Sequence, residues 1–319
     1  MTNKRDLRIV FMGTPDFAVA TLKALLENDY NVVGVITAPD RKAGRGQKLK
    51  FSAVKEFALE HHLNILQPTN LKSESFIEEL KALNSNLQII VAFRMLPKVV
   101  WQMPEFGTFN LHASLLPQYR GAAPIHWAII NGEKKTGVTT FFIDEKIDTG
   151  AIILSEETDI NEDTTVGELH DELMTIGSKL VIKTVRLIEE DKVRTTIQPK
   201  SDDLKTAYKL NRDNCKIDWS KDLDTIYNKI RGLNPFPTAW CCLDNEDKEL
   251  IDIKLYDVAK EYENHNFSPG SVISSKTELK VSCLGGYIKV KEIQLPGKRK
   301  MDIKSLLNGF EFSKNAKLL

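Results

Sequence analysis

The sequence has few cysteines, no excess of charge of either sign and no long apolar run. Its four cysteines form no C-x-x-C pair and have no histidine at metal-ligand spacing, which argues against a zinc site and fits reduced thiols: Cys215, Cys241, Cys242 and Cys283. Basic and acidic residues both number 44, so the formal net charge is zero. The overall charge therefore gives no indication of nucleic-acid or membrane binding.

Membrane and export signals are also missing from the sequence. No segment approaches the roughly 18 apolar residues that a membrane-spanning helix needs. The amino-terminal stretch MTNKRDLRIVFMG has too short an apolar run and no small-residue cleavage site for a signal peptide. We therefore expect a cytoplasmic protein that binds neither a membrane nor a metal.

Two short motifs suggest functions that the rest of the sequence does not support. MGTPDF at residues 12–17 ends a strand and opens a helix, but it lacks G-x-G-x-x-G and the lysine of a P-loop, so helix capping accounts for it. Asp-Thr-Gly at residues 148–150 matches the aspartic-protease triplet. Those enzymes need two such carboxylates, and this chain has one triplet following an α/β pattern, so a protease would need a dimer and a different fold, which argues against that function.

The pattern of apolar residues predicts two structural halves. Apolar runs such as LRIVFMG, NVVGVIT and LQIIVAF alternate with helical patterns, which predicts βαβ units on a largely parallel sheet. Thr165 and Glu168 are spaced as a capping box for a long helix. Near residue 195 the chain becomes polar, like a linker, and short strands at regular spacing follow it. These strands predict a small antiparallel barrel or sandwich.

The stretch FNLHASLLPQYRGAAPIHW, residues 109–127, contains the strongest candidate for chemistry. Asn110 and His112 are two residues apart in a strand, so they share a face about 6–7 Å apart. Asp148 follows another strand in a turn, and we expect it at the carboxyl edge of the same sheet. An amide and an imidazolium can donate hydrogen bonds to a developing oxyanion, and a carboxylate can orient the histidine. This trio suits acyl transfer without a protein nucleophile.

Basic residues gather in two segments, RKAGRGQKLK at 41–50 and KVKEIQLPGKRKMDIK at 289–304. One such cluster is usually a solvated turn. Two clusters, one in each predicted half, make a polyanionic partner more credible.

These segments resemble the formyltransferases that use 10-formyltetrahydrofolate. The motif NLHASLLPQYRGAAPIHWAI, with DEKIDTG downstream, is similar to that family's signature, and PDRKAGRGQKL and GLNPFPTAW are similar to its tRNA-acting branch. The resemblance implies transfer of the formyl group from N10 of the folate to the α-amino group of methionine on initiator tRNA. It implies a Rossmann-like catalytic domain at 1–195, a linker at 196–212 and an OB-like, tRNA-binding β-barrel at 213–319. We expect a monomer.

The resemblance also implies roles for individual residues. Asn110, His112 and Asp148 match the family's catalytic trio. The residues implied to bind the folate are Phe93, Arg94, Met95, Leu96, Ser114, Leu115, Leu116, Pro117, Asp144 and Ile147. Those expected to bind tRNA are Arg41, Lys42, Arg45, Lys48, Lys298, Arg299 and Lys300. Phe93-Arg94 stands where the tRNA branch commonly has Tyr-Gly, so the contacts of the Arg94 side chain stay open.

Three alternatives share parts of this pattern. The formyl group could pass to another amine, such as a purine precursor or an amino sugar, or to water in a hydrolase. The barrel could instead bind RNA beside an inactive front domain, but an intact trio argues against that. The additional domain favours a large acceptor.

Overall fold

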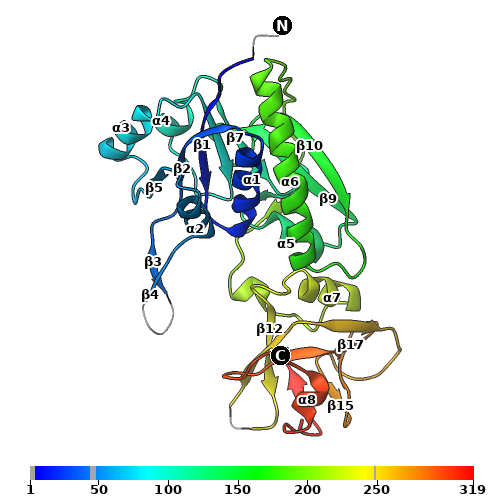
Figure 1. The fold of residues 1–319 in the computed structure, drawn as a ribbon. Helices are drawn as coiled ribbons and strands as arrows, with labels where there is room; N and C mark the ends of the chain where they lie inside the picture. Colours follow the sequence, from blue (N-terminus) through cyan, green and yellow to red (C-terminus); the bar gives the residue numbers. More distant parts are fainter. Residues whose placement is uncertain (1–3, 44–47, 248) are drawn as a thin grey trace. The chain divides into compact units, whose positions relative to one another are not determined.

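The computed structural model describes residues 4–43, 48–247 and 249–319 of the chain. These residues form two compact units that alternate along the sequence (Figure 1). The first unit comprises Met1–Gly121, Gly137–Thr158 and His170–Thr206. The second comprises Ala122–Thr136, Asp159–Leu169 and Ala207–Leu319.

A seven-stranded sheet forms the centre of the first unit, in the order β10-β9-β7-β6-β1-β2-β5. Its strands are β1 (Arg8–Gly13), β2 (Asn31–Ile36), β5 (Ile65–Leu66), β6 (Leu87–Val91), β7 (Thr108–His112), β9 (Lys135–Phe142) and β10 (Ile152–Asp159). The pairs from β7 to β5 are parallel, whereas β9 runs antiparallel to β7. The α/β class with a mostly parallel sheet, predicted from the sequence, is therefore confirmed.

The helices of this part of the chain are α1 (Asp16–Glu27), α2 (Ala53–Glu60), α3 (Glu74–Ala82), α4 (Lys98–Trp101) and α6 (Val166–Glu189). On one face of the sheet, Ile90 of β6 belongs to a buried cluster with Phe76 of α3 and Val100 of α4. Ile90 pairs with Asn110 of β7, so the two side chains point to the same face of the sheet. The sheet face that carries Asn110 is therefore the one that α3 and α4 help to cover.

Gly13 explains the MGTPDF motif in terms of packing. A Cβ atom at Gly13 would lie 2.6 Å from the Cβ of Ala18, closer than side chains approach one another. The glycine therefore lets α1 pack directly against the end of β1. This close approach, and not nucleotide binding, accounts for the residue.

A two-stranded hairpin contains the first basic segment. β3 (Arg41–Ala43) and β4 (Lys48–Lys50) pair antiparallel, with Arg41 opposite Lys50, and the hairpin projects from the sheet (Figure 1). The sequence had predicted an exposed loop here. Because these strands are only three residues long and basic, they carry no apolar alternation that could have revealed them.

The second unit combines helices with two antiparallel sheets. Its helical elements are α5 (Pro124–Ile130), a 3-10 turn (Asp213–Cys215), α7 (Leu223–Arg231) and α8 (Ile303–Leu307). One sheet has the order β19-β18-β13-β12-β20 and the other β14-β17-β16-β15. These strands are β12 (Ala239–Asp244), β13 (Ile251–Leu255), β14 (Val258–Glu261), β15 (Val272–Ser274), β16 (Leu279–Cys283), β17 (Gly286–Val290), β18 (Glu292–Gln294), β19 (Met301–Asp302) and β20 (Lys317–Leu318).

Polar contacts attach the segment 159–169 to α7 of the second unit. Arg231, in α7, is 5% exposed, and its Nη1 donates to the backbone carbonyl of Thr164 at 2.7 Å. The Tyr227 hydroxyl donates to the Asp163 carboxylate at 2.6 Å. These hydrogen bonds explain why residues distant in sequence belong to one compact unit.

No helix among the described residues combines the length and the apolar character needed to cross a bilayer.

Candidate active site

Strand β7 places Asn110 and His112 on one face of the first unit's sheet. Asn110 is half-buried and pairs with Ile90 of β6 and Phe141 of β9. His112, the last residue of β7, is buried and pairs with Thr139 of β9. The structure thus brings the amide and the imidazole to one face, as their spacing predicts.

Asp148 reaches His112 by a different route from the one expected. Because β9 is antiparallel to β7, its last residue, Phe142, lies beside Phe109 and not beside the carboxyl end of β7. The loop between β9 and β10 carries Asp148 back to His112, where Oδ2 lies 3.8 Å from Nδ1. The two side chains are 14% and 8% exposed. Asp148 therefore lies at the carboxyl end of β7, as expected, but the strand that precedes it runs antiparallel to β7 and does not itself end there.

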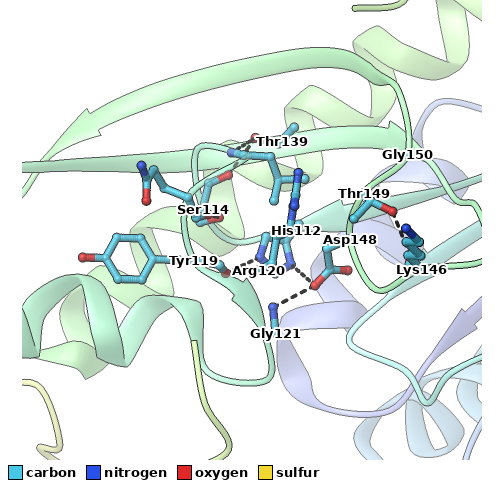
Figure 2. A network of polar contacts seen from close by, with 12 residues as sticks. His112, Ser114, Tyr119, Arg120, Gly121, Thr139, Lys146, Asp148, Thr149 and Gly150 are labelled. Carbon is cyan, nitrogen blue, oxygen red and sulfur yellow. Dashed lines mark hydrogen bonds and ion pairs between the residues drawn. The ribbon is translucent and has the colours of Figure 1, made fainter. Parts of the chain in front are cut away.

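Both groups are oriented by backbone atoms (Figure 2). The Nε2 atom of His112 lies 2.8 Å from the carbonyl oxygen of Tyr119. A carbonyl only accepts hydrogen bonds, so Nε2 carries the proton and Nδ1 is the nitrogen that faces Asp148. The backbone N–H of Gly121 donates to Oδ2 of Asp148 at 2.9 Å and fixes that carboxylate oxygen.

The turn that contains Asp148 is tightly constrained. Asp148 has a φ of 55°, in the left-handed region that non-glycine residues seldom adopt. The Thr149 hydroxyl donates to both carboxylate oxygens of Asp144, at 2.7 and 2.9 Å. A Cβ at Gly150 would lie 1.7 Å from the carbonyl oxygen of Phe142, so only glycine fits there.

Gly150→Ala is therefore expected to displace the Asp148 turn. The added methyl group cannot be accommodated without a backbone shift, and overpacking of this kind typically costs about 1–3 kcal/mol. We expect a lower melting temperature and, since a misplacement of about 1 Å can cost up to ~10²-fold in rate, a clear fall in turnover. Gly309→Ala is the control, because nothing lies within 4 Å of the Cβ built there. Equal melting temperatures for the two variants would contradict this account.

The segment Ser114–Pro117, with Leu115 and Leu116, leaves the end of β7 and is held by β9. The Thr139 hydroxyl donates to the Ser114 carbonyl at 2.7 Å and lies 3.2 Å from the Leu116 N–H. The Ser114 hydroxyl is buried and donates to the Gln118 carbonyl at 2.6 Å. Phe93–Leu96 follows the neighbouring parallel strand β6, whose last residue, Val91, pairs with Leu111. The two segments therefore leave adjacent strands in the same direction.

The Arg94 side chain is bound to the backbone between β5 and α3. Its guanidinium donates to the carbonyls of Thr69 and Pro68 and lies over the Phe93 ring, 5.5 Å from the centroid. Partial desolvation, followed by the like charge of Arg41, lowers the pKa of Arg94.

The other predicted folate residues differ in exposure. Met95 is 68% exposed and Ile147 57% exposed, whereas Leu96 belongs to the buried cluster of α3 and α4. Asp144 accepts hydrogen bonds from the Lys146 N–H and the Thr149 hydroxyl, so its carboxylate helps to hold the turn.

The predicted tRNA-binding residues fall into two groups, one in each unit. Arg41 and Lys42 lie in β3 and Lys48 in β4, and Arg41 is exposed. Arg45 lies outside the described residues. In the second unit, Lys298, Arg299 and Lys300 are exposed in the turn between β18 and β19. Lys300 forms an ion pair with Glu292 at 2.7 Å, which offsets part of that turn's charge.

Several residues that hold the site were not predicted from the sequence. Tyr119 and Gly121 act through a backbone carbonyl and a backbone N–H, which the identity of the residue does not reveal. Gln198 was counted in the linker, but its side chain hydrogen-bonds the carbonyls of Asp148 and Gly150 at 2.9 and 2.8 Å. An isolated glutamine in a polar stretch gives no signal of such a role.

The described part of the chain has no group of three or more histidine, cysteine, aspartate or glutamate residues arranged to hold a metal ion.

Comparison with known proteins identifies the class of protein to which this fold and site belong. A family model described as formyl transferase matches residues 7–185, and a model described as formyl transferase, C-terminal domain, matches residues 209–311. The chain belongs to the formyl transferase family, and the resemblance inferred from the sequence is confirmed.

Curated relatives narrow that class. The methionyl-tRNA formyltransferase of Flavobacterium johnsoniae is 61% identical over 312 residues, covering 98% of this chain and 99% of that protein. The methionyl-tRNA formyltransferase of Bacteroides fragilis is 49% identical over 319 residues, covering 99% and 98%. The chain is thus similar over nearly its full length to methionyl-tRNA formyltransferases.

Solved structures share the fold. An N-formyltransferase from Helicobacter canadensis, in complex with folinic acid and dTDP-3-aminofucose, has a TM-score of 0.62 at 22% identity, covering 89% of this chain and 98% of that one. HypX from Aquifex aeolicus, in complex with tetrahydrofolic acid, has a TM-score of 0.64 at 16% identity, covering 96% and 47%.

Proposed function

We infer that this protein transfers a formyl group from 10-formyltetrahydrofolate to the α-amino group of methionine on initiator methionyl-tRNA. The bond between the formyl carbon and N10 breaks, and a bond to the α-amino nitrogen forms. The amine gives up a proton and N10 gains one. The single observation that carries the chemistry is the pairing of buried His112 with partly buried Asp148, on the strand that also carries Asn110, with no cysteine or serine nucleophile required.

We propose that the trio divides this work as follows. The Asn110 amide and the His112 imidazolium stabilise the negative charge that develops on the formyl oxygen. Asp148 keeps His112 oriented and takes part in moving the proton of the amine. The 3.8 Å between Nδ1 and Oδ2 is longer than a direct hydrogen bond, so we expect a bridging donor, the amine itself or a water molecule, to connect them.

The residues after β6 and β7 suit a folate. A pterin ring needs apolar contacts and a few fixed polar groups. Met95 and Ile147 offer exposed apolar side chains, and the Phe93–Leu96 and Ser114–Pro117 segments leave adjacent parallel strands in the same direction. We propose that these segments, with Asp144 at the turn, hold the folate so that its formyl group faces Asn110 and His112.

We propose that the basic hairpin and the turn at Lys298–Lys300 bind the tRNA. Both carry exposed cations, and Arg and Lys side chains are common contacts to the phosphates of nucleic acids. Arg45, although outside the described residues, stays our preferred contact to the acceptor stem because it matches the acceptor-reading loop of the family's tRNA branch.

We also propose that the catalytic trio and the folate-binding segments belong to a domain at residues 1–195, that residues 213–319 bind tRNA, and that residues 196–212 connect the two. All three residues of the trio lie in one unit of a single chain, which supports a monomeric enzyme. A role in translation initiation supports a cytoplasmic location.

The deciding experiment follows the formyl label. Purified protein is offered 10-formyltetrahydrofolate labelled at the formyl carbon, together with initiator methionyl-tRNA, uncharged initiator tRNA, free methionine or an amino sugar. We expect label in acid-precipitable methionyl-tRNA and in none of the other acceptors. Release of labelled formate at the same rate without any acceptor would identify a hydrolase, and transfer to a free amine would identify a different acceptor.

A further inference from the structure

The segment between Thr196 and Lys205 follows α6 and hydrogen-bonds the backbone near the catalytic trio of the first unit at several points along its length. At its start, Thr196 and Ile152 exchange two backbone hydrogen bonds of 2.8 Å, so the chain pairs with the beginning of β10. A free linker would expose these groups to water. The segment is instead fixed beside the turn that carries Asp148.

Gln198 is the residue of this segment that touches the turn. It is 6% exposed, and its Nε2 donates to the carbonyls of Asp148 and Gly150 at 2.9 and 2.8 Å. Its Oε1 accepts from Nε and Nη2 of Arg120 at 3.1 and 2.6 Å. Both ends of the amide are therefore engaged, which makes this a fully satisfied buried contact.

These hydrogen bonds act on a backbone that needs support. Asp148 has a positive φ, and such conformations persist only where the surroundings hold them. The two carbonyls that flank Thr149 are both fixed by the one amide of Gln198. Arg120 donates to the oxygen of that same amide. The next residue in the chain is Gly121, whose N–H donates to the Asp148 carboxylate.

The far end of the segment fixes the partner of His112. The carbonyl of Lys205 accepts from the Tyr119 N–H at 2.7 Å, and the Lys205 N–H donates to Oε1 of Gln118 at 2.8 Å. The Tyr119 carbonyl is the group that accepts from Nε2 of His112. The same ten-residue stretch thus supports the backbone on both sides of the His112–Asp148 pair.

We propose that Gln198 is a positioning residue for formyl transfer: its buried amide fixes the Asp148–Gly150 turn and thereby the carboxylate that faces His112. This inference rests on the proposed function. Gln198 touches no reacting atom, so it acts on the rate through Asp148 alone. Its loss should lower kcat and leave the KM values for folate and tRNA almost unchanged.

The test uses Gln198→Glu in the full-length protein. The carboxylate has the same shape and can still accept from Arg120, but it cannot donate to the two carbonyls. Displacing a catalytic group by about 1 Å can cost up to ~10²-fold, so we expect kcat to fall by about 10–100-fold with each KM within about threefold of wild type. Circular dichroism and the melting temperature report whether the variant is folded.

Asn86→Asp is the matched control. Asn86 also ties two stretches of backbone together through its amide, accepting from the Arg8 N–H at 2.8 Å and donating to the Asp6 carbonyl at 2.7 Å. It does so at the amino ends of β1 and β6, away from the trio. We expect this variant to lose stability but to keep the wild-type kcat.

The outcomes separate this inference from the proposed function. If the wild-type protein transfers no formyl group to methionyl-tRNA, the proposed function fails. If the wild type is active and a folded Gln198→Glu keeps its kcat, or if Asn86→Asp loses as much kcat, the positioning role is overturned. Should Gln198→Glu not fold, Arg120→Met is the deciding variant, because it removes the hydrogen bonds that the half-buried Arg120 donates to Oε1 of Gln198. A loss of kcat of at least threefold then supports the positioning role, and an unchanged kcat overturns it.

Discussion

His112→Ala and Asp148→Asn are each expected to slow formyl transfer by about 10²–10⁴-fold, the range for loss of an acid–base or oxyanion-stabilising group. The two side chains face each other across 3.8 Å, and both are held by backbone atoms that do not depend on either side chain. Each variant should therefore fold and bind folate while losing turnover. Single-turnover transfer to methionyl-tRNA measures the effect.

The chain offers a second histidine–aspartate pair as the control. His170 Nδ1 lies 3.0 Å from the Asp171 carboxylate on α6, where both side chains are exposed, at 36% and 76%. His170→Ala and Asp171→Asn remove the same chemical groups without touching the proposed site. Turnover near the wild-type level in a folded His112→Ala or Asp148→Asn would refute the assignment of the trio.

Arg45→Glu should reduce kcat/KM for methionyl-tRNA by about 10–100-fold, because a charge-assisted contact is worth about 1.5–3 kcal/mol and the new carboxylate repels phosphate. Folate affinity should not change. The same substitution at Arg41, which is exposed in β3, should act in the same direction. For the wild type, affinity for tRNA should fall with salt, with a log–log slope of roughly −0.7 to −0.9 for each phosphate neutralised.

Lys23→Glu controls for the change in net charge. Lys23 lies on α1 and is 61% exposed, and it belongs to neither basic segment. If Lys23→Glu weakens tRNA turnover as strongly as Arg45→Glu does, the effect is one of total charge, and the hairpin has no special part in the reaction. An unchanged kcat/KM in Arg45→Glu would remove that residue from tRNA binding altogether.

Local patterns were sufficient for much of the fold. The apolar runs at β1, β2 and β6 are buried strands, and the Thr165–Glu168 capping box forms, with the Thr165 N–H donating to Glu168 at 2.8 Å. The spacing of Asn110 and His112 alone fixed their common face. Each of these predictions depends on residues that are near one another in sequence, so local sequence periodicity is enough to make them.

The parts that were missed depend on distant partners. An apolar strand looks the same whether its neighbour is parallel or antiparallel, so the direction of β9 could not be inferred from GVTTFFI. The carbonyl of Tyr119 and the N–H of Gly121 belong to backbone that every residue type has. Gln198 lies 50 residues from Asp148 in the chain, and its polar surroundings gave the pattern of a solvated linker.

The position of Gln198 has a consequence for dissecting this protein into fragments. A catalytic fragment that stops at residue 195 retains Asn110, His112 and Asp148, but it lacks the amide that bonds to Asp148 and the Lys205 carbonyl that bonds to Tyr119. Inactivity of such a fragment would therefore say nothing about whether the remainder of the chain is needed to hold tRNA. The smallest informative fragment has to extend through Thr206, where the first compact unit ends.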